Sequence, residues 1–535
     1  DLGLPHSVVE MTDDAPQKNL WEVRKAGLNI MMSLKGDGKP VSFIEDCAVP
    51  LQHLADYTDA LTQVFARHGT RGTWYAHASV GTLHVRPILD MRRGDAQGRS
   101  VGAAKMRAIA EEASELVRQF KGAYSGEHGD GLCRGEWISW QFGPRVTQAF
   151  ADIKQMMDPL NLLCPQRMVN PPTMDDTTLM RFAPSYKVIP IQTALDWSAW
   201  NVQNDPVTEA TSAPGSGGDP AQGFAKAVEM CNNNGHCRKF DAGTMCPSYR
   251  VTRDEKHLTR GRANTLRLAL SGQLGGQLSP APSGGGVGGG GGIVLPGQPQ
   301  LAHGSEDALT SEAVKASFEL CVSCKGCKRD CPTGVDMAKM KVEFLQHYKA
   351  KHGHTLKDKL IAHLPDYAPL ASRFAPLLNL RDRFPLLASL SEKLLGLSVQ
   401  RSLPQWQRQH FFNSLNTVRA EPVEALRQAQ GERAFGVTRE EVLAAAKPVV
   451  LFVDTFNGYF ESDNAFSALK VLQAAGYTVH VAAKQVADGK HLCCGRTFLA
   501  NGMVDHAKAK AQELVDALLP FAEKGIAIVG LEPSC

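Results

Sequence analysis

Four closely spaced cysteines carry the densest chemistry in this sequence. The stretch CVSCKGCKRDCP, residues 321–332, has the pattern C-x2-C-x2-C-x3-C-P. Thiolates at this spacing bind the irons of a [4Fe–4S] cluster, and in two-cluster ferredoxins the fourth cysteine, which precedes proline, binds the other cluster. A zinc ion is the alternative for any four-cysteine site. The spacing and the trailing Pro332 favour a cluster.

A second cysteine stretch lies upstream and supplies the partner ligands. Residues 231–247 are CNNNGHCRKFDAGTMCP, in which Asn234 stands where the middle cysteine of the motif would be. The crossover rule then gives one complete set: Cys246, Cys321, Cys324 and Cys327. The other set is one ligand short: Cys231, Cys237 and Cys331. We therefore predict one intact [4Fe–4S] cluster, and the second site holds a three-iron cluster, a cubane with a non-cysteine ligand, or nothing.

Two histidines and a carboxylate form another candidate site. His77 and His84 flank the Gly81 turn in HASVGTLH, and Glu127 and His128 lie between glycines in SGEHGDG. Such a set is a common group of ligands for a divalent metal with positions left open for substrate, and the glycines let the backbone approach a ligand. On spacing alone, two strand histidines and a polar turn explain these residues equally well.

Hydrophobic periodicity predicts the elements that position these residues. It favours helices at 51–69 and 104–123 and two short strands around the Gly81 turn within 72–89. Residues 1–172 are therefore expected to form an α+β unit. From residue 447 onward, short apolar strands alternate with amphipathic helices, which is typical of a parallel α/β domain.

Three stretches have compositions that argue against a core of their own. Residues 173–222 are expected to be a linker, and the Gly-rich stretch 271–304 is expected to be a disordered insertion in the cysteine region. The low-complexity insertion at 418–435 is given no function. The chain does not begin with methionine, and we expect it to be an internal fragment of a longer polypeptide.

Composition excludes several classes of protein. The 43% hydrophobic and 21% charged residues are ordinary for a globular chain, and a net charge of +3 without a basic block argues against nucleic acid binding. No stretch has the roughly 20 apolar residues of a spanning helix. Clustered cysteines without a signal segment favour a reducing compartment, the cytoplasm, or the inner face of the membrane.

Five motifs in residues 1–172 resemble FAD-linked oxidases. In order they are LWEVRKAG, FIEDCAVP, HASVGTLHVRP, SGEHGDGLCR and DPLNLLCPQRMVNPP. They resemble the C-terminal half of the vanillyl-alcohol-oxidase-like flavoenzymes that act on D-2-hydroxy acids. The resemblance implies FAD as cofactor, with most of the flavin-binding part upstream of residue 1.

The resemblance also implies roles for individual residues. His77, His84 and Glu127 match the family's metal ligands, with zinc, iron or manganese as the metal. His128 matches the base that accepts the hydroxyl proton, and Arg24 matches an arginine that binds the substrate carboxylate.

One departure from the family bears on the substrate. Arg86 stands where relatives have an asparagine that contacts substrate. An arginine there would hold a second carboxylate, which favours 2-hydroxyglutarate over lactate. The alternative is that Arg86 faces solvent or a structural acid.

The remaining cysteines resemble two further modules. The stretch CPSYRVTRDEKHLTRGRANTLR, which begins at Cys246, resembles bacterial proteins in which oxidase and ferredoxin modules are fused. Cys493 and Cys494 in HLCCGRTF, with Cys535, resemble the cysteine-rich CCG domain of heterodisulfide-reductase-type subunits. Glu532 stands where that domain carries a further cysteine, so a structural or docking role is the alternative to cluster binding.

Taken together, the sequence predicts an α+β multidomain chain. Its expected parts are an FAD-linked oxidase C-terminal (substrate/cap) domain at 1–172, a linker at 173–222, a small α-helical ferredoxin-like iron–sulfur domain at 223–350, a helical connector at 351–446 and a truncated α/β CCG-type domain at 447–535. The resemblance implies an FAD- and iron–sulfur-dependent dehydrogenase of D-2-hydroxy acids, with D-2-hydroxyglutarate preferred and D-lactate or glycolate as the alternative. A non-catalytic electron-transfer subunit is the alternative from another class. The expected acceptor is a quinone or an electron-transfer flavoprotein, reached in the cytoplasm or as a peripheral protein on the membrane.

Overall fold

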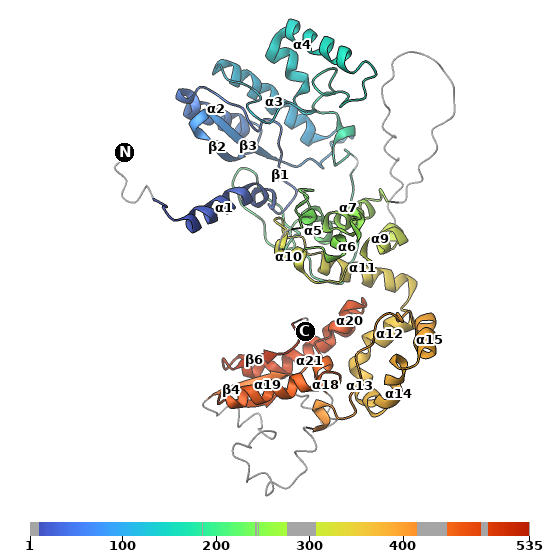
Figure 1. Cartoon of the computed structure of the whole chain (residues 1–535). Coiled ribbons are helices and arrows are strands. Elements are labelled where there is room, and N and C mark those ends of the chain that lie inside the picture. Colours follow the sequence, from blue (N-terminus) through green and yellow to red (C-terminus); the bar gives the residue numbers. More distant parts are fainter. Residues whose placement is uncertain are drawn as a thin grey trace, which may run out of the picture. The chain divides into compact units, whose positions relative to one another are not determined.

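The computed structural model describes residues 10–184, 186–240, 243, 245–274, 306–414, 447–482 and 491–533. The chain divides into two compact units, Asp1–Lys341 and Val342–Cys535, called unit 1 and unit 2 below (Figure 1). Most of the Gly-rich insertion, the low-complexity insertion at 418–435 and Cys535 lie outside the described residues.

The first half of unit 1 is a small α+β structure. Its elements are α1 (Asp14–Met32), β1 (Lys39–Pro40), η1 (Leu51–His53), α2 (Leu54–Arg67), β2 (Gly72–His77), η2 (Ala78–Val80), β3 (Thr82–Leu89), α3 (Val101–Gln119), η3 (Gly135–Trp137), α4 (Ile138–Met157) and η4 (Thr177–Leu179). The helices predicted at 51–69 and 104–123 and the two strands predicted around Gly81 are confirmed by α2, α3, β2 and β3.

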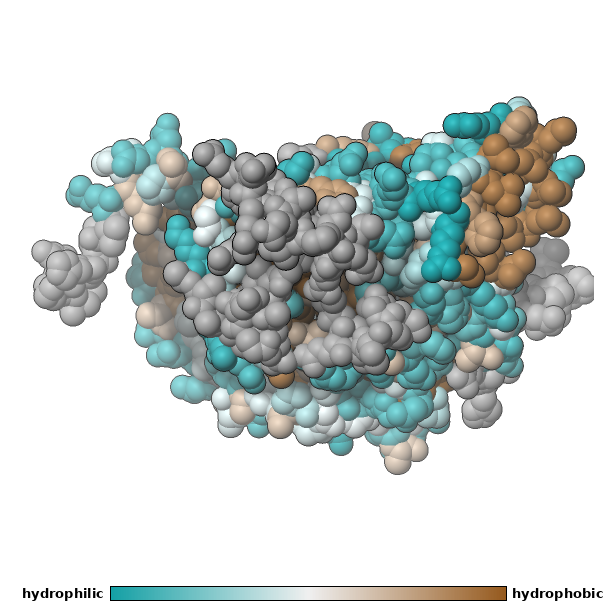
Figure 2. All heavy atoms as spheres, turned by 90° about the horizontal axis from the view of Figure 1, so that it is seen from below, coloured by the Kyte–Doolittle hydropathy of each residue, from teal (hydrophilic) through white to brown (hydrophobic). Residues whose placement is uncertain are grey.

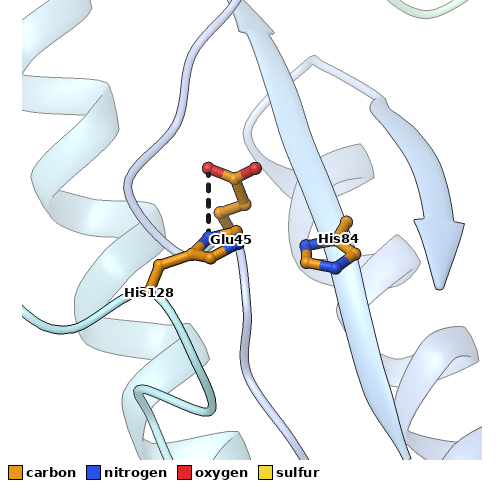
Figure 3. Close-up of side chains that lie close together, drawn as sticks. All are labelled: Glu45, His84 and His128. Carbon is orange, nitrogen blue, oxygen red and sulfur yellow. Dashed lines mark ion pairs between the residues drawn. The ribbon is translucent and has the colours of Figure 1, made fainter. Parts of the chain in front are cut away.

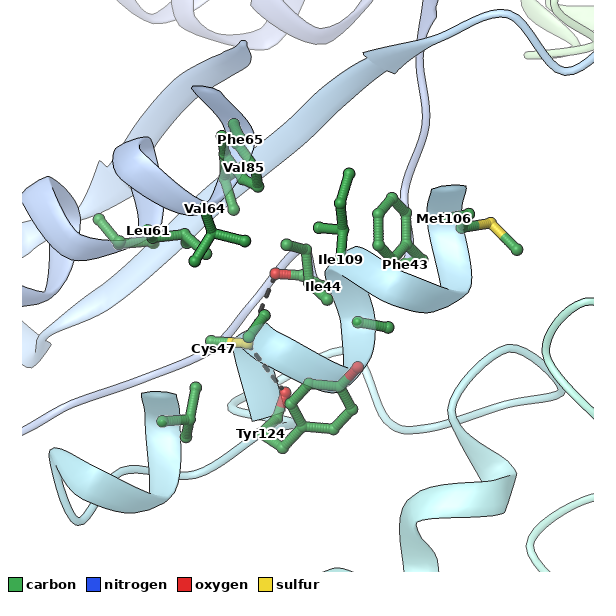
Figure 4. Close-up of a cluster of buried hydrophobic side chains, with 14 of the residues drawn as sticks. Phe43, Ile44, Cys47, Leu61, Val64, Phe65, Val85, Met106, Ile109 and Tyr124 are labelled. Atoms are coloured by element: carbon green, nitrogen blue, oxygen red, sulfur yellow. Dashed lines mark hydrogen bonds between the residues drawn. The ribbon is translucent and has the colours of Figure 1, made fainter. Parts of the chain in front are cut away.

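The sheet of unit 1 is antiparallel, in the order β1-β3-β2. Alternate residues of β3 point to opposite faces. Val85 points toward α2 and α3, where it packs with Phe65 and Ile109 in the core drawn in Figure 4. His84 and Arg86 lie on the opposite face, and both are buried. The helices thus hold one face of β3 rigidly while its other face carries polar side chains.

The second half of unit 1 is built from short helices. They are α5 (Phe224–Glu229), η5 (His236–Arg238), α6 (Pro247–Thr252), η6 (Glu255–His257), α7 (Thr259–Leu270), α8 (Glu306–Leu309), α9 (Glu312–Phe318), α10 (Gly326–Asp330) and α11 (Met337–His352), the last of which continues into unit 2. The two cysteine stretches lie in the turns between these helices.

The stretch predicted as a linker, 173–222, packs against both halves of unit 1. Trp197 is 1% exposed and contacts the ring of Phe224. The Asn204 side chain accepts a hydrogen bond from the N–H of Gly38 at 3.0 Å and donates one to the carbonyl of Gly38 at 2.8 Å. Its composition suggested a linker. The same polar side chains and glycines can instead form the hydrogen bonds of a buried backbone in a tightly turned segment.

Unit 2 contains helices followed by a parallel sheet. The helices are α12 (Leu356–Ala362), α13 (Leu364–Arg373), α14 (Ala375–Leu378), η7 (Asn379–Asp382) and α15 (Pro385–Leu395), and the sheet region comprises β4 (Pro448–Phe452), α18 (Thr455–Tyr459), α19 (Ser462–Ala474), β5 (Thr478–Val481), α20 (Arg496–Ala500), α21 (Val504–Ala522) and β6 (Ala527–Gly530). The strand order is β5-β4-β6 and both pairings are parallel, which confirms the predicted α/β arrangement. Among the described helices, none is long and apolar enough to cross a bilayer.

The turn between β2 and β3 generates the first prediction. Gly81 has φ +70°, and a Cβ at this position would lie 2.0 Å from the carbonyl oxygen of Val49. We expect Gly81→Ala to lower the midpoint of thermal unfolding, because it adds a steric clash to the about 1–2 kcal/mol that a left-handed backbone costs a residue with a side chain.

Gly98→Ala is the matched control. Gly98 has φ +76°, but a Cβ there meets nothing within 4 Å. Gly98→Ala should therefore lower the unfolding midpoint only by the cost of the left-handed backbone. Equal decreases in the two variants would contradict the packing of Gly81 against Val49.

Candidate functional site

The β2–β3 hairpin and one loop bring together the predicted metal ligands. His84 Nε2 lies 2.8 Å from Glu127 Oε1, and His77 Nε2 lies 3.7 Å from the same oxygen. One ligand atom from each of the three side chains lies within 4.8 Å of the other two. His84 is buried, whereas the side chains of His77 and Glu127 are 48% and 41% exposed. This set therefore fits a divalent metal that is held from one side and open on the other.

His128 lies beside this set, between two carboxylates. Its Nε2 is 3.4 Å from Glu127 Oε1, and its Nδ1 is 3.8 Å from Glu45 Oε2. Figure 3 shows the imidazole of His128 between Glu45 and His84. The rings of His84 and His128 are stacked with their centroids 5.0 Å apart. Ring stacking and two acidic neighbours together restrict how the imidazole can turn.

Burial controls the protonation of His84. It lowers the pKa of His84, and the nearby Glu127 carboxylate only partly opposes this effect. A neutral imidazole is the form that binds a metal ion. His84 is thus suited to be a ligand at neutral pH.

A buried ion pair shapes the loop that carries Glu127 and His128. The Asp46 carboxylate is fully buried, and the Arg134 guanidinium donates to it. The N–H groups of Glu127 and His128 also donate to Asp46, at 2.8 and 2.6 Å. Arg134 additionally donates to the carbonyl oxygens of Tyr124, at 3.0 Å, and Gly129, at 2.6 Å. The loop 124–134 is therefore tied at both ends and in its middle.

These contacts are reflected in the titration of Asp46. Burial opposes ionisation, but the hydrogen bonds from Arg134 and from the two N–H groups outweigh it and hold the pKa of Asp46 below its usual value. The carboxylate is consequently charged throughout the neutral range.

The two predicted substrate arginines differ in their surroundings. Arg86 is 5% exposed and forms an ion pair with Glu45, so it contacts a structural acid, which was the alternative considered for it. Arg24 on α1 is exposed, and its guanidinium carbon lies 4.8 Å from the centre of the Tyr75 ring. Tyr75 in turn stacks on His84 at 4.5 Å. The structure thus brings Arg24 to the open side of the histidine site and holds Arg86 beneath it.

The four cysteines of the complete set line one narrow cavity. Cys246, Cys321, Cys324 and Cys327 share it with Pro247 and Thr259. The N–H of Thr259 donates to Cys246 Sγ at 3.0 Å, a contact typical of cluster ligands. A zinc ion with Zn–S bonds of 2.3 Å would hold its sulfurs about 3.8 Å apart. Within the described residues, no three cysteine sulfurs lie within 4.8 Å of one another.

The cysteines of the shorter set act on one another electrostatically. Burial raises the pKa of Cys231, to which the neighbouring Cys331 adds, while Arg181 opposes the shift. Burial raises the pKa of Cys237 to about 11, and Cys246 and Cys231 contribute. Cys231 therefore lies near both other members of its set.

The CCG stretch of unit 2 lies at the end of the parallel sheet. Cys493 and Cys494 line a small cavity with Asp454 and Thr455. Cys493 Sγ accepts a hydrogen bond from the N–H of Gly495 at 3.3 Å. Cys535 lies outside the described residues, so the third member of this predicted group has no described position.

Sequence analysis did not single out Glu45, Asp46 or Arg134. A signal was present in the FIEDCAVP motif, where two acids stand between the buried residues Ile44 and Cys47. Adjacent carboxylates inside an apolar run need partners. Which partners they take depends on contacts between residues far apart in sequence.

Comparison with known proteins matches two parts of the chain to described families. Residues 3–168 match the family described as FAD linked oxidases, C-terminal domain, and residues 227–335 match the 4Fe-4S dicluster domain. Over 97% of its length the chain is 27% identical to the D-2-hydroxyglutarate dehydrogenase of Escherichia coli (strain K12), of which it covers 46%. It is also 27% identical to the protein of the same name from Pseudomonas putida, over 99% of this chain and 48% of that protein. Over 28% of its length it is 29% identical to a glycolate oxidase subunit of Bacillus subtilis, of which it covers 30%.

The chain therefore contains an FAD linked oxidase C-terminal domain followed by a 4Fe-4S dicluster domain. This finding confirms the predicted resemblance and the predicted fold class. The chain spans about half the length of the D-2-hydroxyglutarate dehydrogenases that it matches.

The Asp46–Arg134 pair generates the second prediction. Asp46→Asn should lower stability by about 3–5 kcal/mol, because it leaves the buried Arg134 without a counter-charge. It should also weaken metal binding, since Asp46 fixes the N–H groups of Glu127 and His128. Chemical denaturation and zinc titration would measure the two effects.

Asp95→Asn is the control. Asp95 also accepts hydrogen bonds from two backbone N–H groups and from an arginine, Arg99, but on an exposed turn. The contribution of Asp46 should be present above the usual aspartate pKa of about 3.9 and be lost as the pH falls through its lowered folded value. A wild-type acid unfolding limb that Asp46→Asn leaves unchanged would contradict this role.

Proposed function

We propose that this protein oxidises a D-2-hydroxy acid to the 2-oxo acid, passing a hydride to FAD and the electrons onward through an iron–sulfur cluster. The observation that carries the proposal is the convergence of His77, His84, Glu127 and His128 at the turn end of the β2–β3 hairpin. It is supported by the four-cysteine cavity on the same chain. FAD, when bound, supplies the hydride acceptor, and a cluster passes electrons one at a time.

The metal is proposed to be held by His77, His84 and Glu127. Bound there, a divalent cation supplies a Lewis acid next to the substrate hydroxyl. The neutral state favoured for His84 by burial and the exposed sides of His77 and Glu127 support this assignment.

His128 is proposed to take the hydroxyl proton. Its side chain is 44% exposed and therefore reachable by substrate. Its Nδ1 faces Glu45 at 3.8 Å, and the proton transfer is assigned to the other ring nitrogen, Nε2. Nε2 also lies on the Glu127 side, where the hydroxyl of a metal-bound substrate would be.

Arg24 is proposed to bind the substrate's C1 carboxylate. Its guanidinium has no acidic partner among the residues that the structure describes, and it lies over Tyr75 next to His84. An unpaired guanidinium offers a carboxylate two parallel N–H donors.

D-2-hydroxyglutarate is the preferred substrate, because relatives named for it align with nearly the whole chain. Arg86 adds little to this preference, since Glu45 already neutralises it. Glycolate is the second candidate, supported by the similarity of the first domain to a glycolate oxidase subunit. D-lactate is the third, and a non-catalytic electron-transfer subunit is the alternative of another class.

The test is a substrate panel on the intact protein with a dye acceptor. D-2-hydroxyglutarate should give the highest kcat/KM, and its L-enantiomer should be inactive. His128→Asn should lower kcat by about 10²- to 10⁴-fold, the usual effect of removing a general base.

His68→Gln is the matched control, because His68 also contacts a glutamate, Glu112, but precedes β2 at the end of the hairpin opposite the turn. It should keep wild-type activity. Inactivity of the wild type on every D-2-hydroxy acid, with its iron content intact, would instead favour the electron-transfer subunit.

We further propose that unit 2 rests on an anionic membrane surface through α13–α15. Large apolar side chains are exposed there, shown as a brown region at the right of Figure 2: Leu370, Phe374, Leu377, Phe384, Leu386, Leu390 and Leu394. The nearby cations Arg373, Arg383 and Lys393 have no acidic partner within the described ranges. Leucines and phenylalanines beside unpaired cations are the composition of helices that lie in a lipid headgroup layer.

Vesicle sedimentation tests this proposal. The intact protein should sediment with phosphatidylglycerol vesicles and much less with phosphatidylcholine vesicles. The double variant Leu386→Asp/Leu390→Asp should stay in the supernatant, whereas Val471→Asp, at an exposed position on α19, should sediment as the wild type does. Dimerisation through these leucines without vesicle binding would contradict the proposal.

A further inference from the structure

The shorter cysteine set does not fit the cluster that the matched domain implies. Two [4Fe–4S] clusters bound only by thiolates require eight cysteines. Between residues 227 and 335 the sequence has seven: Cys231, Cys237, Cys246, Cys321, Cys324, Cys327 and Cys331. Four of them line the cavity described above, which leaves three for the second site.

Asn234 stands at the position of the absent cysteine, but its side chain is already used. Its Oδ1 accepts a hydrogen bond from the N–H of His236 at 2.8 Å, and its Nδ2 donates to Asn232 Oδ1 at 2.6 Å. Asn234 is exposed, whereas Cys231 and Cys237, which flank it in the sequence, are buried. Asn234 therefore shapes the turn between two ligands and presents its amide away from them.

The charges around this set suit an anionic cluster with three protein ligands. Arg181 and Arg260 are the cations that lie close enough to Cys231 to act on it electrostatically. Arg181 donates from Nη1 to the carbonyl oxygen of Cys231 at 2.8 Å. Its buried Nε has no hydrogen-bond partner among the described residues. A buried N–H without an acceptor is costly, and a cluster sulfide next to Cys231 would supply one.

We propose that Cys231, Cys237 and Cys331 hold a [3Fe–4S] cluster, because the position of a fourth thiolate ligand carries Asn234. Three thiolates match three irons, and the turn 232–234 offers no fourth thiolate: Asn233 presents only an amide oxygen, which accepts a hydrogen bond from Cys231 Sγ at 3.8 Å. The proposal goes beyond the proposed function, which needs only one cluster, and its readout needs no substrate. The chain would then carry two clusters of different iron content.

Electron paramagnetic resonance on the intact protein, purified without air and oxidised with ferricyanide, is the test. An oxidised three-iron cluster has an unpaired spin and gives a near-isotropic signal, whereas an oxidised [4Fe–4S] cluster of the ferredoxin type gives none. We expect this signal together with about seven irons per chain, the sum of one four-iron and one three-iron cluster.

Variants then locate the signal. Asn234→Cys completes the motif, and it should abolish the three-iron signal and raise the iron content to about eight. Asn234→Ser is the matched control, since it loses the same amide contacts without adding a thiolate ligand, and it should keep the signal. Cys331→Ala should remove the signal and leave the reduced-state spectrum of the other cluster.

Three results would overturn the proposal, and the wild-type protein alone can give each of them. About four irons per chain would mean that the second site is empty. About eight irons without the three-iron signal would mean a second complete cube. Conversion of the wild type to that state by ferrous ion and reductant under argon would mean a cube with a non-protein ligand, from which iron had been lost.

Discussion

The ion pair between Asp46 and Arg134 is the interaction on which the histidine site depends. Asp46 precedes β2 and β3, and Arg134 ends the loop that carries Glu127 and His128. Burying both charges costs several kcal/mol per ion before their attraction is counted. The N–H groups of Glu127 and His128 complete the hydrogen bonding of the carboxylate and so offset part of that cost. The loop is therefore held by its backbone at the two positions whose side chains do the proposed chemistry.

The adjacent acids Glu45 and Asp46 hold different parts of the site. Asp46 fixes the backbone of the loop, whereas Glu45 pairs with Arg86 on β3 and faces the imidazole of His128. Glu45 and Asp46 lie in a turn, and their side chains reach different partners. One short stretch of chain thus positions both the main chain and the ring of the same histidine. A single insertion between the two acids would separate these functions.

Local patterns in the sequence were enough to predict the hairpin, its flanking helices and the pairing of distant cysteines. Each of these follows from periodicity or ligand spacing, which involve residues near one another in sequence. The surroundings of Arg86 were not predictable in this way. Spacing leaves open whether it meets substrate or a structural acid, and only the packing of residues 43–47 against β3 gives it Glu45 as a partner. Residues 173–222 were predicted to be a linker from their composition. That composition indicates that the segment has no core of its own, but it does not exclude contacts with the core of a neighbouring part.

The packed segment 173–222 has a consequence for electron flow. Asn204 is bonded to Gly38 near the first sheet, and Arg92 after β3 pairs with Glu229 on α5 at 2.6 Å, two residues before Cys231. Side-chain contacts thus join the half of unit 1 that carries the histidine site to the half that carries the two cysteine stretches, and the two halves are not connected by a flexible segment alone. Under the proposed function, the folded chain fixes the distance that electrons cross between the two halves, and the rate of this transfer should be insensitive to solvent viscosity.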